Sequence, residues 1–109
     1  MYIGTVAEKK KPTYDLGAFK QAFSNVAALR VTSAAYGTAF AVGFGRTEIV
    51  ATIQSMKQGH FFKSMTSYSD DCEWQDVYHV PSSISPLYVK FRSDALTEFA
   101  LLSFKEKEP

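Results

Sequence analysis

The sequence predicts an α+β domain in which N-terminal helices pack on a mainly antiparallel, twisted sheet. Up to about residue 60, apolar side chains recur at the three- and four-residue spacing of amphipathic helices. From residue 61 onward they alternate with polar residues in four short segments separated by turn-rich linkers. The 109 residues suit a single domain, so we expect residues 1–109 to form one, with residues 1–12 as a flexible lead-in.

The first helix is expected from Tyr14 to about Phe23, with Thr13 as its N-cap and Asp15 in its first turn. The apolar run at residues 29–32 could form an isolated strand. A second, looser helix is expected to follow, capped by Ser33 and running through Ala39.

The third helix, from Thr47 to Lys57, has the clearest pattern, and Gly59 is expected to stop it. Its apolar stripe is interpreted as core packing and consists of Ile49, Val50, Ile53 and Met56.

Strands are expected at residues 61–68, 74–80, 87–92 and 98–105. No helix separates them, so they should form an antiparallel meander. Since neighbours in a strand point to opposite faces, one face could gather polar groups while the other meets the helices. The expected polar set is Lys63, Gln75, Tyr88, Lys90 and Lys105, and the expected helix-facing set is Leu87, Val89, Phe91, Leu102 and Phe104. Phe61 and Met65 are expected beside Lys63, and a bulge could overturn this arrangement.

Lysines that converge with a phenol and an amide suit a negatively charged ligand, because ammonium groups bind phosphate oxygens as point charges. Such a set also suits metal-free RNA cleavage, in which the ribose 2′-hydroxyl attacks the adjacent phosphorus and the protein stabilises the charged transition state. His79 could take part in acid–base chemistry, although a lone histidine is more often structural.

Composition bears on metal binding, nucleic-acid binding and cellular location. Cys72 is the sole cysteine and there are two histidines, so no metal site or other cofactor is expected. The formal charge of +1 is weaker than that of proteins that bind long nucleic acids without specificity. No apolar run of about 18 residues or signal-peptide core occurs, so a cytoplasmic protein is expected.

Four blocks resemble the MqsR family of toxins, which are RelE-like messenger-RNA interferases of toxin–antitoxin systems. They are FFKSMTSYSD, WQDVYHV, LYVKF and LLSFKEK, in this order, and KKPTYDL extends the likeness towards the N-terminus. The resemblance implies a RelE-like fold and ribosome-independent cutting of messenger RNA at GCU-type triplets. It also implies a cognate antitoxin with a zinc-binding part and a helix-turn-helix.

The resemblance further implies that Lys63, Gln75, Tyr88 and Lys105 are the catalytic residues. Lys63 and Lys105 would hold the scissile phosphate, Tyr88 would act in proton transfer or position the attacking hydroxyl, and Gln75 would orient the substrate. Weaker candidates for substrate binding are His79, Lys90 and Tyr78. The chain departs from the family pattern at Phe62, where a tyrosine is common, and at His79, where an arginine can occur.

Two alternatives to a lysine-dependent ribonuclease remain at this stage. One is a non-enzymatic RNA-binding or regulatory module that keeps the fold, which the weak net charge would suit. The other is a nuclease that depends on His60 and His79.

Overall fold

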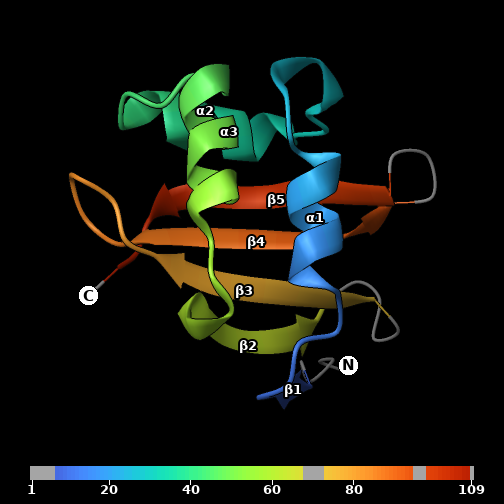
Figure 1. Ribbon diagram of the computed structural model, residues 1–109. Coiled ribbons are helices and arrows are strands. Elements are labelled where there is room, and N and C mark those ends of the chain that lie inside the picture. The colour runs from blue at the N-terminus through green and yellow to red at the C-terminus, as the bar shows by residue number, and fades with distance from the viewer. Residues whose placement is uncertain (1–6, 68–72, 95–97, 109) are drawn as a thin grey trace, which may run out of the picture.

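The computed structural model describes residues 7–67, 73–94 and 98–108 and confirms the α+β class. Its five strands form one antiparallel sheet in the order β1-β2-β3-β4-β5 (Figure 1). The helical elements are α1 (Leu16–Ala22), η1 (Val26–Ala28), α2 (Ser33–Ala41), α3 (Arg46–Ser55) and η2 (Gln58–His60). The strands are β1 (Glu8–Lys9), β2 (Phe61–Thr66), β3 (Trp74–Val80), β4 (Leu87–Asp94) and β5 (Glu98–Glu106). Cys72 and parts of the linkers after β2 and β4 lie outside the described residues.

Helix α1 begins later than expected, and its N-cap is Asp15 rather than Thr13. The Asp15 carboxylate accepts hydrogen bonds from the backbone N–H groups of Gly17 and Ala18. Thr13 and Tyr14 instead donate their backbone N–H groups to the carboxylate of the fully buried Asp76 in β3. This anchor to the sheet keeps residues 13 and 14 outside the helix.

The other two helices lie within a few residues of the expected bounds. Thr32, not Ser33, caps α2, since its hydroxyl accepts from the backbone N–H of Ala35. Three residues of the expected stripe, Ile49, Ile53 and Met56, are buried in the core, whereas Val50 is only partly buried. Gly59 lies inside η2 rather than ending α3, whose C-cap is Met56. The expected strand at residues 29–32 is reduced to a parallel bridge between Val31 and Leu101.

Strand β1 is a feature that the sequence did not predict. Glu8 pairs with Met65 and Lys9 with Ser64, so part of the expected lead-in extends the sheet beyond β2. Ala7 reinforces the pairing, because its N–H donates to the Thr66 hydroxyl at 2.8 Å and its carbonyl accepts from the Thr66 N–H at 2.9 Å.

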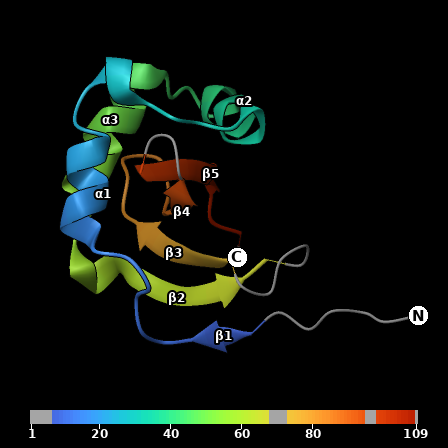
Figure 2. The same ribbon diagram turned by 90° about the vertical axis from the view of Figure 1, so that its right-hand side faces the viewer.

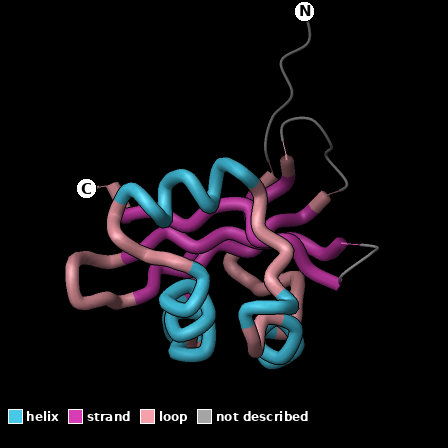
Figure 3. The backbone as a smooth tube through the Cα atoms, turned by 90° about the horizontal axis from the view of Figure 1, so that it is seen from above, coloured by secondary structure: helices cyan, strands magenta, loops and turns pink. Residues whose placement is uncertain are grey.

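The core lies between the helices and one face of the sheet. The rings of Phe19 in α1 and Phe91 in β4 stack with 3.6 Å between their centroids. Seen from the side, α1 and α3 cover this face while α2 lies beyond β5 (Figure 2). From above, α1 and α3 lie side by side on one side of the strands, while α2 lies on the other side, along β5 at the edge of the sheet (Figure 3). The described residues include no helix with the length and apolar character needed to cross a membrane.

Two irregularities in strand pairing correct the expected faces. In β5, a register shift pairs Lys90 with Ser103 but Phe91 with Leu101. Leu101 is therefore fully buried among the helix-facing side chains, and Leu102, expected there, is only partly buried. In β2, a shift between Phe61 and Lys63 turns Phe61 towards the core, where it packs against Tyr78 rather than beside Lys63.

Candidate functional site

The face of the sheet opposite α1 and α3 carries two rows of paired residues that contain most of the predicted site. In the first row, Lys63 pairs with Val77, Val77 with Lys90, and Lys90 with Ser103. In the second, His79 pairs with Tyr88 and Tyr88 with Lys105. Since Tyr88 and Lys90 are two apart in one strand, both rows lie on the same face. We call this the cationic face, defined by Lys63, Gln75, His79, Tyr88, Lys90 and Lys105.

The bulge in β2 adds an aromatic side chain that the sequence did not nominate as a site residue. Phe62 stacks on the His79 ring with 4.1 Å between centroids and keeps 38% of its surface exposed. Bulges commonly re-aim side chains in this way next to functional sites. Alternation counted back from Lys63 would have placed Phe62 on the helix side, and the signal in the sequence was the departure from the family's tyrosine at this position.

A pocket of about 380 Å³ opens beside this stack. Its lining combines three rings with lysines and one carboxylate: Phe62, His79, Tyr88, Lys105, Lys107 and Glu108. The pocket can therefore accept a planar group against its aromatic wall and an anion against its lysines.

Tyr88 lies at the centre of the cationic face. The Lys105 ammonium is 5.4 Å from the centroid of its ring. Burial raises the pKa of Tyr88, and the Glu8 charge also raises it, while the Lys63 charge opposes the shift. The phenol therefore keeps its proton at neutral pH and is a donor there.

Two other groups on the face are shifted towards their neutral forms. Burial, with the neighbouring charge of Lys105, lowers the pKa of Lys90. Burial and the charges of Lys107 and Lys63 lower the pKa of His79, so its imidazole is neutral at pH 7. The arrangement concentrates positive charge that a bound anion would offset.

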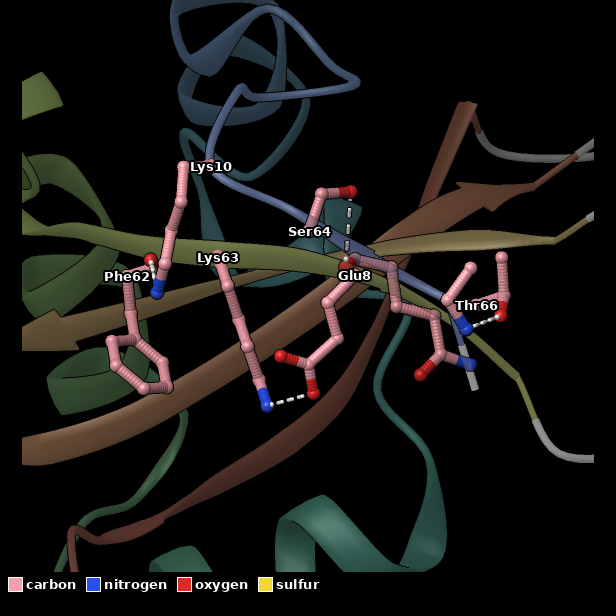
Figure 4. Close-up of polar contacts among 8 residues, drawn as sticks. Glu8, Lys10, Phe62, Lys63, Ser64 and Thr66 are labelled. Carbon is pink, nitrogen blue, oxygen red and sulfur yellow. Dashed lines mark hydrogen bonds and ion pairs between the residues drawn. The ribbon is translucent and has the colours of Figure 1, made fainter. Parts of the chain in front are cut away.

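Lys63 is held by an ion pair. Its ammonium lies 2.7 Å from a carboxylate oxygen of Glu8, which β1 brings onto the cationic face. Figure 4 shows the two side chains running alongside each other until their charged ends meet. The Lys63 side chain is 19% exposed and that of Glu8 50%. Glu8 was missed because nothing in the sequence marked residues 8 and 9 as a strand.

Gln75 lies in the neighbouring row, paired with Met65. Its amide nitrogen donates to Glu73 at 2.7 Å, and the other Glu73 oxygen lies 3.5 Å from the Arg92 guanidinium. Because Glu73 accepts from the amide nitrogen, the Gln75 side chain is oriented before any ligand binds.

Tyr78 is the one predicted site residue that the structure does not bring to the cationic face. Its side chain is fully buried on the helix side, and its hydroxyl accepts a hydrogen bond from the Gln58 amide at 3.3 Å. Burial raises its pKa to about 12. Alternation explains this placement, since His79, the next residue in β3, faces the other way.

His60 and His79 contact different residues. Its Nδ1 accepts from the backbone N–H of Lys57 and closes the turn of η2. Within the described ranges, no three His, Cys, Asp or Glu side chains form a group that could hold a metal ion.

Comparisons with known proteins agree with the motifs. A family model described as "Motility quorum-sensing regulator, toxin of MqsA" matches residues 11–106. A relative named mRNA interferase toxin MqsR, from Escherichia coli (strain K12), is 32% identical over 100 residues. These cover 92% of this chain and 99% of the relative.

Proposed function

Since the chain belongs to the MqsR toxin family, we propose that it is an endoribonuclease that cuts messenger RNA and is restrained by an antitoxin. The observation that carries this proposal is the cationic face, where three lysines, a phenol and an oriented amide share one side of the sheet. In Figure 2, α1 and α3 lie on the other side of the sheet and α2 lies beside its β5 edge, so we infer that a strand of RNA can reach the described part of this face over β2, β3 and β4.

The proposed reaction is transesterification. The ribose 2′-oxygen attacks the adjacent phosphorus, the bond to the 5′-oxygen breaks, and the products end in a 2′,3′-cyclic phosphate and a 5′-hydroxyl. Lys63 and Lys105 bind the non-bridging oxygens and stabilise the charge that grows on them. Tyr88, which keeps its proton, donates it to the leaving 5′-oxygen. Gln75 orients the substrate through its amide oxygen, and Lys90 adds positive charge.

Recognition of single-stranded RNA follows from the same surface. The exposed ring of Phe62 and the neighbouring His79 and Tyr88 offer flat surfaces on which bases can stack. We propose cleavage of free RNA at GCU-type triplets, without a ribosome and without a metal ion. The lysines and the phenol can supply the charge and the proton that a metal-bound water would otherwise supply.

The proposed partner is the family's antitoxin, MqsA. We propose that it carries a zinc-binding part and a helix-turn-helix and binds the sheet or its flank. Toxin and antitoxin would meet in the cytoplasm, where messenger RNA is found.

One alternative is a non-enzymatic RNA-binding module, which the formal charge of only +1 and the ion pair of Lys63 with Glu8 would suit. Binding without cutting would leave RNA intact and make the phenol of Tyr88 dispensable. This alternative and the proposed enzyme therefore differ in the fate of the RNA.

The test uses purified protein, a ribosome-free messenger RNA and a chelator. We expect cleavage at discrete sites, products with 2′,3′-cyclic phosphate ends, and a rate about a hundredfold lower for Lys105→Ala. Expression should arrest growth, and Lys63→Ala and Lys105→Ala should relieve the arrest. Intact RNA, or arrest that survives both substitutions, would favour binding over cutting. Loss of activity in His79→Ala alone would favour the histidine-dependent nuclease.

A further inference from the structure

The cationic face needs a group that removes a proton from the attacking 2′-hydroxyl, and most of its side chains cannot do so at neutral pH. All three lysines of the face are needed as cations, including Lys90, which adds positive charge. Tyr88 keeps its own proton, and an amide such as Gln75 is not a base. Among the described residues, the remaining acceptors considered near the face are His79 and the carboxylates Glu8, Glu73 and Glu108, the last at the rim of the pocket.

The four acceptors differ in the groups that they contact. Glu73 is bound to Gln75 through one oxygen and lies 3.5 Å from Arg92 through the other. His79 has Phe62 stacked on its ring, and Glu108 is exposed beyond the end of β5. Of these four groups, Glu8 is the one that contacts a proposed phosphate ligand directly, with 2.7 Å between its carboxylate oxygen and the Lys63 ammonium.

Backbone pairing fixes Glu8 on this face. Since Glu8 pairs with Met65 in β2, alternation sends the next residue to the opposite side, where the Lys9 ammonium lies 4.2 Å from the centroid of a Trp74 ring. The two hydrogen bonds between Ala7 and Thr66 hold β1 against β2 on the N-terminal side of Glu8. The charges of both Glu8 and Lys63 reach Tyr88 electrostatically, so the carboxylate, the ammonium and the phenol form one cluster.

We propose that Glu8 is the general base of this site and accepts the proton of the 2′-hydroxyl as that oxygen attacks the phosphorus. The inference rests on the proposed function. When a phosphate oxygen takes over Lys63, the carboxylate lies next to the phosphate and thus to the ribose that bears the nucleophile. The new bond joins the 2′-oxygen to phosphorus, the 5′-oxygen leaves with the Tyr88 proton, and Glu8 ends protonated. Exchange with water restores both groups.

The test is Glu8→Gln, which keeps the size of the side chain but cannot accept the proton. Two quantities are measured on one oligonucleotide that the wild type cleaves: the single-turnover rate, and the Kd of the same oligonucleotide with a deoxyribose at the scissile position. We expect the rate to fall about 10²- to 10⁴-fold. The Kd should stay equal or become lower, because the anion beside Lys63 has been removed.

Glu8→Asp and Glu106→Gln are the matched controls. The first keeps a carboxylate and should retain more rate than Glu8→Gln. The second removes one exposed carboxylate from β5, at the other edge of the sheet, and should cleave like the wild type. Thermal unfolding of each variant shows whether the fold is kept.

Two results would overturn the assignment. A Glu8→Gln rate equal to or above that of the wild type would make Glu8 a surface partner of Lys63. A loss of rate matched by an equal loss of affinity for the deoxy oligonucleotide would make it a positioning residue. If the wild type itself left RNA intact, the proposed function would fail first, so the two failures are distinguishable.

Discussion

Tyr88 and Lys105 are paired across β4 and β5, and the ammonium of Lys105 lies 5.4 Å from the centroid of the Tyr88 ring. The pairing places a proton donor beside a cation on a rigid strand pair rather than on a loop. Bond-breaking at a phosphodiester needs both, because charge grows on the phosphate oxygens while the leaving oxygen takes up a proton. The predictions below separate the contributions of these groups.

Replacing Lys105 by Ala should lower the single-turnover cleavage rate about a hundredfold, because one charge that stabilises the transition state is lost. Lys63→Ala should have an effect of the same order. The matched control is Lys57→Ala, which removes an exposed lysine between α3 and η2. A Lys105→Ala protein that cleaves at nearly the wild-type rate would refute the role of this residue.

Tyr88→Phe removes only the phenolic oxygen and should lower the rate by at least about a hundredfold, with little change in affinity for a non-cleavable RNA. Tyr78→Phe is the control, since it removes a phenol from the opposite side of β3. It should cost about 1 kcal/mol of unfolding free energy through the lost bond from Gln58 and leave the rate unchanged. Equal rates for the two variants would contradict the assignment of Tyr88 as donor.

Lys90 should make RNA binding depend on pH in the alkaline range. Burial and the Lys105 charge lower its pKa, so its positive charge is lost at a lower pH than that of an exposed lysine. Affinity for a fully 2′-O-methylated RNA should therefore weaken as the pH rises from about 7 to about 10. The charged groups that influence the pKa of Lys90 are Lys105 and Lys63, which lower it, and Glu73, which raises it.

The control for this pH dependence is Lys90→Arg, because a guanidinium stays charged across the range. Its binding curve, measured by fluorescence anisotropy at constant ionic strength, should be flatter than that of the wild type. Superimposable curves would show that Lys90 contributes nothing to the pH dependence.

Asp76→Asn tests the anchor between the sheet and the start of α1. The carboxylate accepts from the backbone N–H groups of Thr13 at 3.1 Å and Tyr14 at 2.9 Å in a fully buried setting. An amide turns a donor towards one of them, so the free energy of unfolding should fall by about 1–3 kcal/mol. Urea denaturation measures this, and an unchanged midpoint would contradict the account.

Much of the cationic face was predictable because alternation in β3 and β4 is regular. His79, Tyr88 and Lys90 each lie on the side that their position in the strand indicates. Lys63 and Lys105 lie in other strands. Placing them on the same face required an assumption about how the four strands are aligned with one another. The resemblance to the MqsR family supported that assumption independently of the alternation.

The parts that sequence could not provide arise from irregular pairing. The bulge in β2 turns Phe61 towards the core and stacks Phe62 on His79. The bulge in β5 places Leu101 in the core, where Leu102 was expected. Strand β1 is two residues long, so no period can reveal it. It is nevertheless the element that brings Glu8 to Lys63.

A crystal structure of the protein with an RNA that carries a deoxyribose at the mapped cleavage position would test the central claim directly. The account predicts that the ammonium groups of Lys63 and Lys105 both lie about 2.8 Å from non-bridging oxygens of the scissile phosphate. Tyr88 should lie beside the 5′-oxygen of that phosphate. A phosphate bound elsewhere, or contacted by neither lysine, would contradict it.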